Sequence, residues 1–165
     1  MDFPRLNTGR VLAGAIASAL LIVSILFFSW YSYDLEGVAK TSDPDDWLCG
    51  VHENSCTAWE TFPILRWLLL LLAVAPLILA YILVRGHKLS YPPGEMTMIS
   101  GFAGAVLIFY NGVIDKPGTG PAEIGLGLDW GYWVALLCAV AIAVVGFTRS
   151  LESGPKKTRK APGTV

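Results

Sequence analysis

The stretch ILRWLLLLLAVAPLILAYILV, residues 64–84, decides the fold of this chain. It contains one charged side chain, Arg66, close to its first residue. The hydrocarbon core of a bilayer takes about 20 residues of helix, and a helix satisfies its own backbone hydrogen bonds in lipid. Residues 64–84 therefore predict a transmembrane helix.

Three further stretches have the same character. Residues 11–30, 96–114 and 130–148 contain no charged side chain, and each is long enough to span. Of the 165 residues, 54% are hydrophobic and 15% are charged, and a soluble domain of this size could not bury so much apolar surface. The sequence predicts one all-α domain over residues 1–149, an integral membrane four-helix bundle.

The basic residues predict the orientation of the four spans. Because lysine and arginine concentrate on the cytoplasmic side, both termini and loop 85–95 are expected there, with loops 31–63 and 115–129 outside. Nine of the twelve basic residues support this assignment: Arg5, Arg10, Arg85, Lys88, Arg149, Lys156, Lys157, Arg159 and Lys160. The expected location is the cell membrane, crossed four times. Residues 150–165 are polar and basic, which predicts a disordered cytoplasmic tail that attracts anionic lipid.

Two cysteines stand in the first outer loop. Cys49 and Cys56 lie in the predicted oxidising compartment, so we expect a disulfide that staples this short extracytoplasmic loop. A thiol-exchange pair is an alternative, although such cysteines are usually only two residues apart. A zinc site of Cys49, His52 and Cys56 is another, and it lacks a clear fourth ligand other than Glu53. We expect no cofactor and no resident metal.

Tryptophan is confined to the predicted outer side. Amphipathic rings prefer the headgroup level of a bilayer, so the pattern indicates either anchoring and loop packing or a rim that docks a partner or lipid. The six positions are Trp30, Trp47, Trp59, Trp67, Trp130 and Trp133. Arg66 lies beside one of these rings. Three roles are open for this side chain: it reaches to the lipid headgroups, it forms an ion pair with Glu60 or Asp129, or it binds a substrate anion.

Small residues recur at four-residue spacing inside the spans, a pattern that lets helix backbones approach closely. They are Gly14 and Ser18 in the first span, Gly101 and Ala105 in the third, and Ala135, Ala139 and Ala143 in the fourth. Helix packing within one monomer and a homodimer seam are the two interpretations.

Several polar or special residues in and near the spans carry further expectations. Pro76 predicts a kink in the second span. Asn111 is expected to donate a hydrogen bond to a neighbouring helix, whereas Ser24 and Ser100 are expected to bond back to their own helices. Thr61 is expected to cap the second span.

Short aromatic motifs carry a resemblance. The runs FFSWY at 27–31, TAWETF at 57–62 and NGVID at 111–115 resemble a group of small uncharacterised actinobacterial four-span membrane proteins. The resemblance implies a four-helix membrane fold with a shorter first outer loop, and it implies no activity. A tryptophan, Trp47, ahead of the two loop cysteines is more loosely similar to the claudin-like tetraspan arrangement, although the Gly-Leu-Trp run of that family is absent.

Functional expectations follow by elimination. The spans contain no catalytic, metal or nucleotide motif, and the chain has no basic stripe with interleaved aromatics that would fit nucleic acid. We expect a non-enzymatic structural or accessory subunit of a cell-envelope complex, embedded in the lipid bilayer with a membrane-protein partner or with copies of itself. A small oligomeric transporter or channel is the main alternative, and an envelope thiol oxidoreductase is the third.

Overall fold

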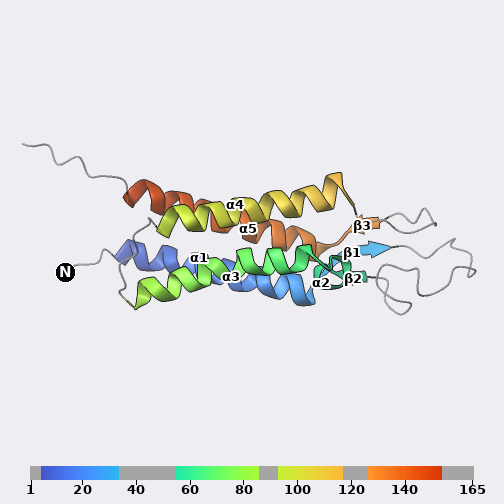
Figure 1. Ribbon diagram of the computed structural model, residues 1–165, viewed down its shortest axis with the longest axis horizontal. Coiled ribbons are helices and arrows are strands. Elements are labelled where there is room, and N and C mark those ends of the chain that lie inside the picture. Colours follow the sequence, from blue (N-terminus) through green and yellow to red (C-terminus); the bar gives the residue numbers. More distant parts are fainter. Residues whose placement is uncertain (1–4, 34–54, 86–92, 117–125, 154–165) are drawn as a thin grey trace, which may run out of the picture.

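The computed structural model describes residues 5–33, 55–85, 93–116 and 126–153. Within these residues, four helices are long and apolar enough to cross a membrane. They run side by side along one axis (Figure 1), which is consistent with the predicted multi-pass membrane protein. The helices are α1 (Arg5–Phe27), α3 (Leu65–Val84), α4 (Pro93–Phe109), which continues into the π-helix η2 (Tyr110–Ile114), and α5 (Trp130–Ser153).

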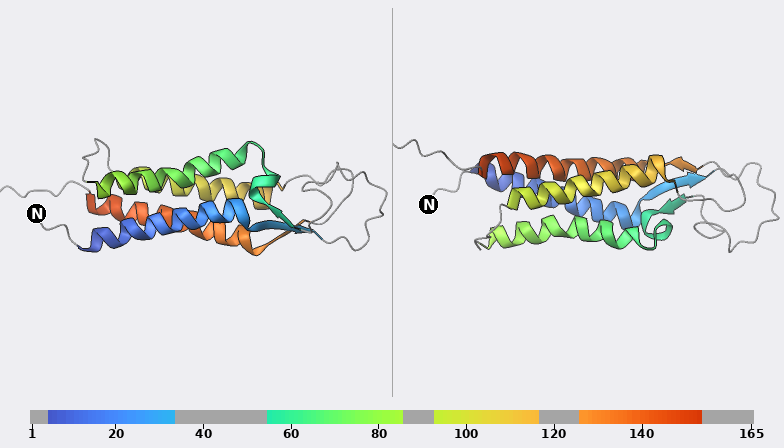
Figure 2. Two further views of the ribbon diagram at one scale, coloured as in Figure 1. Left: turned by 90° about the horizontal axis from the view of Figure 1, so that it is seen from below. Right: turned by 45° about the horizontal axis from the view of Figure 1, so that its top comes forward.

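The helices form a four-sided bundle in which each one contacts two neighbours. The contact between α4 and α5 is the most extensive, α1 lies against α5 and α3, and α3 closes the ring against α4. Two views of the bundle show this arrangement (Figure 2). The centre is filled by fully or almost fully buried aliphatic side chains: Leu21, Ile25, Leu69, Ile108 and Ile142.

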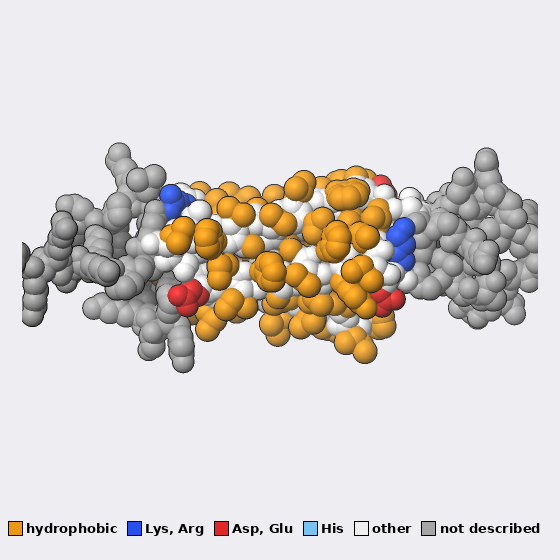
Figure 3. All heavy atoms as spheres, turned by 90° about the horizontal axis from the view of Figure 1, so that it is seen from above, with side chains coloured by type: hydrophobic (Ala, Val, Ile, Leu, Met, Phe, Trp, Pro, Cys, Tyr) orange, Lys and Arg blue, Asp and Glu red, His pale blue; other side chains and the backbone are white. Residues whose placement is uncertain are grey.

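The outer surface of the bundle is also apolar. Large hydrophobic side chains on all four helices point away from the core, among them Leu12, Leu71, Phe102 and Leu137. Apolar side chains cover the length of the bundle in Figure 3, and the charged side chains visible there lie at its two ends. A continuous apolar surface between two charged rims is what a lipid-facing bundle requires.

The described residues also contain a small sheet, so the all-α prediction is incomplete. β1 (Ser29–Tyr33) follows α1 directly and is the central strand, with β2 (Ser55–Thr57) and β3 (Leu126–Leu128) antiparallel on either side. The two segments predicted as separate outer loops therefore meet in one sheet. We call this end of the bundle the sheet end, and the opposite end, where α1 begins and α5 finishes, the terminal end (Figure 1).

The helix boundaries differ from the predicted spans at several places. α1 and α4 begin earlier than predicted, at Arg5 and at Pro93. Trp30 belongs to β1, because α1 ends at Phe27. The third span changes from an α-helix to a π-helix at Tyr110. The fourth helix continues to Ser153 and thus takes up the first residues of the predicted tail, while residues 154–165 lie outside the described part of the chain.

A short helix, α2 (Ala58–Thr61), precedes α3 and corrects the predicted cap. Thr57 caps α2, and its side chain and that of Glu60 form a reciprocal capping box. Thr61 is buried and donates from its hydroxyl to the carbonyl of Thr57 at 2.8 Å. Ile64 precedes α3 without a side-chain cap, so the predicted cap by Thr61 is wrong.

Glycines bring the backbones of α4 and α5 into contact. A Cβ atom on Gly101 would lie 2.3 Å from the backbone nitrogen of Ala143, and one on Gly146 would lie 2.2 Å from that of Met98. Gly94 meets the end of α5 in the same way, with Ser150 N at 2.6 Å from its notional Cβ. No side chain fits at these three positions without moving a helix backbone.

The other predicted small residues also face helices of the same chain. Ser18 and Ala135 are fully buried, Ala139 is almost fully buried, and Ala105 packs against the core. A Cβ atom on Gly14 would lie 3.3 Å from Cγ1 of Val145. These placements favour packing within the monomer over a seam between two copies.

Pro76 is buried in the interior of α3, and the helix continues through it. Proline has no N–H, so the carbonyl of Leu72, four residues earlier, loses its partner in the helix. The hydroxyl of Ser100 on α4 donates to this carbonyl at 2.5 Å. Ser100 therefore bonds to a neighbouring helix and not to its own, which corrects the prediction and explains how a proline is accommodated in lipid.

Candidate functional site

Buried aromatic side chains close the bundle beneath the sheet. Trp30 and Tyr31 of β1 and Tyr132 of α5 are all buried. The rings of Trp30 and Tyr132 meet edge to face with their centroids 6.0 Å apart, an arrangement that aromatic pairs favour. The sheet is thus joined to the helix ends by a packed aromatic layer.

One group of hydrogen bonds in this layer links α1 to α5. The indole N–H of Trp30 donates to the carbonyl of Ser24 at 3.1 Å, near the end of α1. The hydroxyl of Ser24 donates to the carbonyl of Gly131 at 2.8 Å, so its bond reaches α5 and does not return to its own helix as predicted. Gly131 is required here because a Cβ atom would lie 2.4 Å from the carbonyl oxygen of Ser29.

A second group links β1 to the π-helix. The phenol of Tyr31 donates to the carbonyl of Asn111 at 3.1 Å. The side-chain amide of Asn111 donates to Leu107 in its own helix at 2.9 Å, so the predicted bond from Asn111 to a neighbouring helix is wrong. Burial, and in addition the nearby phenol of Tyr132, raises the pKa of the Tyr31 phenol above its ordinary value. Tyr31 therefore remains a neutral donor at physiological pH.

The predicted tryptophan rim is only partly a surface. Trp30 is buried, so it cannot contribute to a rim, because α1 ends before it and β1 turns it into the core. Trp47 lies outside the described residues, and Trp59 is half-buried. Three rings are more than half exposed at the sheet end of α3 and α5: Trp67, Trp130 and Trp133.

Arg66 is held between two tryptophans at the sheet end of α3. The guanidinium carbon lies 4.7 Å from the ring centroid of Trp59 and 5.9 Å from that of Trp67, and the two rings are themselves 5.1 Å apart. Nη1 of Arg66 donates to the carbonyl of Trp59 at 3.1 Å. We call these three residues the Arg66 site.

The carboxylates predicted as ion-pair partners of Arg66 are engaged elsewhere. Glu60 accepts from the backbone and hydroxyl of Thr57 at 3.1 and 3.0 Å. Asp129 accepts from the hydroxyl of Ser29 at 2.5 Å. Neither forms the predicted ion pair, and in the described residues Nε of Arg66 is buried without a hydrogen-bond partner.

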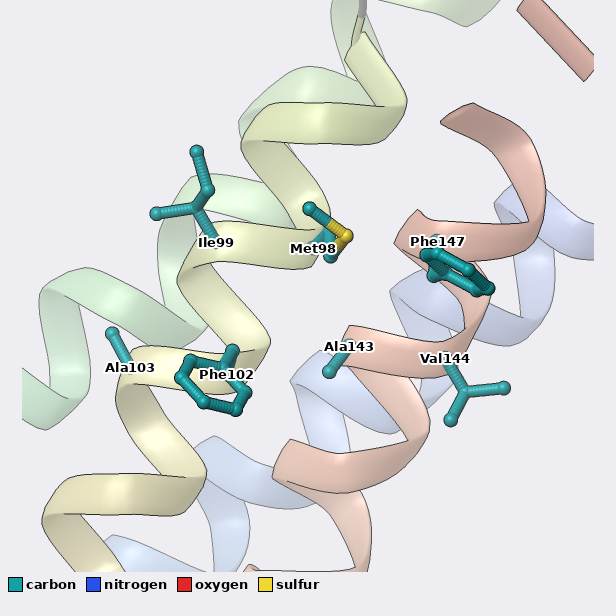
Figure 4. Close-up of a pocket in the computed structure, with 7 residues that line it drawn as sticks. All are labelled: Met98, Ile99, Phe102, Ala103, Ala143, Val144 and Phe147. Atoms are coloured by element: carbon teal, nitrogen blue, oxygen red, sulfur yellow. The ribbon is translucent and has the colours of Figure 1, made fainter. Parts of the chain in front are cut away.

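A groove of about 430 Å³ lies between α4 and α5, toward the terminal end. Its walls are entirely apolar, and the aromatic rings of Phe102 and Phe147 stand on opposite sides of it (Figure 4). Both rings are exposed on the outer surface of the bundle. The lining residues are Met98, Ile99, Phe102, Ala103, Ala143, Val144 and Phe147.

Only some of the cysteines and of the predicted metal ligands belong to the described residues. Cys56 is buried in β2, and Cys138, in α5, is the free cysteine of the described residues. The remaining residues of the proposed disulfide and zinc site, Cys49, His52 and Glu53, lie outside them. Across the described ranges, no group of three or more His, Cys, Asp or Glu side chains is arranged to hold a metal ion.

The class that the fold defines is a four-helix bundle of membrane-spanning length with a small sheet at one end. No protein-family model matches the chain, and comparisons with curated proteins and with solved structures also give no match. The resemblance to actinobacterial four-span proteins and the looser claudin-like similarity stay predictions.

Proposed function

We propose that this protein is a non-enzymatic structural or accessory subunit of a cell-envelope membrane complex. The observation that carries the proposal is the α4–α5 groove, an entirely apolar hollow on the outer surface of the bundle. A path for a polar solute would need polar walls, whereas apolar walls suit the side chains of another transmembrane helix. Transmembrane helices associate mainly through such van der Waals packing.

The groove is preformed. Its two helices are in backbone contact at Gly101 and Gly146, so the spacing between the walls is fixed before any partner arrives. Binding to a rigid surface costs less conformational entropy than binding to one that must first become ordered. A partner helix that inserts a bulky side chain between Phe102 and Phe147 would gain contact area on both sides.

The proposed orientation places the sheet end outside and both chain termini in the cytoplasm. The distribution of basic residues supports this orientation. The first residue of α1 and the last residue of α5 lie at the same end of the bundle, as an even number of crossings requires (Figure 1). In this orientation the basic tail, residues 154–165, would meet anionic lipid of the inner leaflet.

A disulfide between Cys49 and Cys56 is part of the proposal. Both cysteines belong to the proposed outer side, where the compartment is oxidising, whereas Cys138 lies within the fourth span, so Cys49 is the partner that the sequence offers Cys56. The burial of Cys56 also disfavours the thiol oxidoreductase alternative, since thiol exchange needs an accessible thiolate. Alkylation of the denatured, unreduced protein should modify one of its three cysteines, and modification of all three would contradict the disulfide.

Photo-crosslinking in intact cells tests the partner. A photoreactive amino acid replaces Val144 in the groove or, as a control, Ile78 on α3, which is equally exposed at 54%. We expect a protein adduct of one defined mass from position 144, little or none from position 78, and loss of the adduct in Phe102→Ala/Phe147→Ala. Equal yields at both positions would contradict the proposal. An adduct with a second copy of the chain would favour the oligomeric transporter or channel.

A further inference from the structure

The Arg66 site holds a cation in a fixed position. The guanidinium lies against the faces of Trp59 and Trp67 and is tied to the main chain by the bond to the Trp59 carbonyl. Trp59 itself is fixed by α2, whose first turn is closed by the capping box of Thr57 and Glu60. An arginine that only reached toward solvent would not be held at three points.

The positive charge of this site is not neutralised by the described residues. Nε of Arg66 is buried without an acceptor, and a buried charged donor without a partner is costly. Arg66 also lies in the first turn of α3, where the helix dipole adds positive potential and so disfavours a cation. An anion bound to the half-exposed guanidinium would neutralise its charge and offset the potential of the helix dipole.

The other end of the same helix provides a contrast. Arg85 follows α3, stacks on Tyr81 with the guanidinium carbon 4.9 Å from the ring centroid, and is exposed. At a helix C-terminus the dipole is negative and stabilises a cation. Arg85 therefore has no need of an anion, although its ring contact is similar in distance to that between Arg66 and Trp59.

The depth of the site identifies the anion. Exposed tryptophans prefer the headgroup layer of a bilayer, and Trp67, Trp130 and Trp133 mark that level at the sheet end. A guanidinium at this depth faces phosphate groups, which it can bind through two parallel N–H bonds. The exposed apolar side chains that follow Arg66 on α3, among them Leu68 and Leu71, would lie along the acyl chains of the same molecule.

We propose that Arg66, with Trp59 and Trp67, forms a binding site for the phosphate group of a phospholipid in the leaflet at the sheet end. The site accepts one lipid, recognised by its phosphodiester. The inference depends on the membrane location of the bundle but not on its role as an accessory subunit, so either can fail without the other.

Native mass spectrometry of the full chain in mild detergent tests the site. The probes are phosphatidylglycerol, diacylglycerol with the same acyl chains but no phosphate, and inorganic phosphate. We expect one tightly held phosphatidylglycerol, and about a tenfold loss of its affinity in Arg66→Gln, as the loss of charge-assisted hydrogen bonds implies. Arg85→Gln, the matched control, should bind as the parent does, and diacylglycerol should not bind tightly to either.

Two further variants distinguish a binding site of defined geometry from non-specific attraction of the lipid to a positive charge. Arg66→Lys keeps the charge but loses the paired N–H geometry, so its affinity should fall between those of the parent and Arg66→Gln. Trp67→Ala keeps the charge and removes an exposed ring, so it should also weaken binding and serves if Arg66→Gln does not fold. Full affinity in Arg66→Lys or in Trp67→Ala, or equal losses in Arg66→Gln and Arg85→Gln, would overturn the proposal. Displacement of the lipid by inorganic phosphate would also overturn it, because the site would then take a free anion.

Discussion

The α4–α5 pair and the sheet end are held together by different means. Between α4 and α5 the backbones touch at Gly101 and Gly146, and no side chain separates them. At the sheet end, large rings fill the space, and Trp30 and Tyr31 donate hydrogen bonds to main-chain carbonyls. The helix pair should therefore be sensitive to any atom added at Gly101 or Gly146, and the sheet end should be sensitive to the loss of a hydrogen-bond donor.

The largest effect is expected where a new atom meets backbone. Gly101→Ala places a methyl group 2.3 Å from Ala143 N, which must force the helices apart and should cost about 3 kcal/mol. Gly104→Ala on the same helix is the control, since its Cβ would lie 3.8 Å from that of Ala139, an ordinary contact. Unfolding of both variants in mixed detergent measures the difference, and equal stabilities would show that the backbones do not touch.

A smaller effect is expected where the neighbour is a side chain. Gly112→Ala at the sheet end would bring Cβ to 2.1 Å from the Tyr132 ring, but a ring can turn aside as a backbone cannot. We expect a loss of about 1.5 kcal/mol in the same unfolding measurement. A loss as large as that of Gly101→Ala would mean that the aromatic layer is as rigid as the helix pair.

Removing one hydrogen-bond donor from the aromatic layer should destabilise the protein by less than Gly112→Ala does. Tyr31→Phe deletes the bond to the Asn111 carbonyl and should destabilise the protein by about 1 kcal/mol at neutral pH. Tyr81→Phe, on the exposed surface of α3, is the control and should be close to neutral. Equal stabilities of the two variants would show that this hydrogen bond does not stabilise the sheet end.

The same variant predicts a pH dependence. The pKa of Tyr31 is raised in the folded state, so above about pH 10, the ordinary pKa of tyrosine, the unfolded chain loses this proton first. The contribution of Tyr31 is complete below that pH and declines above it. Stability of the parent should thus fall toward that of Tyr31→Phe between about pH 10 and 11, and a constant difference would contradict the shift.

The smallest effect is expected from the bond that compensates for proline. Ser100→Ala removes the donor to the Leu72 carbonyl and should cost about 0.6 kcal/mol, the typical value of a hydrogen bond between transmembrane helices. Thr148→Ala removes a hydroxyl that bonds only within its own helix, to Val145, and serves as the control. If Pro76→Ala is introduced first, the cost of Ser100→Ala should shrink, because Leu72 regains its partner within the helix.

The spans were predictable because apolar length is a local property. The second span was predicted at residues 64–84, and α3 occupies Leu65–Val84. Gly101 and Ala143 were found by four-residue spacing, but Gly146 was missed because it lies three residues after Ala143. Spacing along one helix does not reveal which residue faces it on another.

The sheet end was less predictable because its contacts join distant segments. β2 and β3 have three residues each, too few to show alternation, and they become strands only by pairing with β1. Trp30 was predicted to lie on the rim because tryptophans at the ends of transmembrane helices usually face the headgroups. That expectation fails here because Trp30 belongs to β1, which turns its ring into the core. The hydrogen bond from the Ser24 hydroxyl to the Gly131 carbonyl also joins two segments that are far apart in the sequence, so no local pattern predicts it.

The order of the sheet has a consequence for biogenesis. β1 leaves the ribosome immediately after the first helix, but one of its two neighbours, β3, directly precedes the last. One edge of the central strand β1 therefore stays unpaired until synthesis has passed β3 and reaches the final span. Completion of this sheet requires the chain as far as Leu128, so a product truncated before β3 would keep one edge of β1 unpaired.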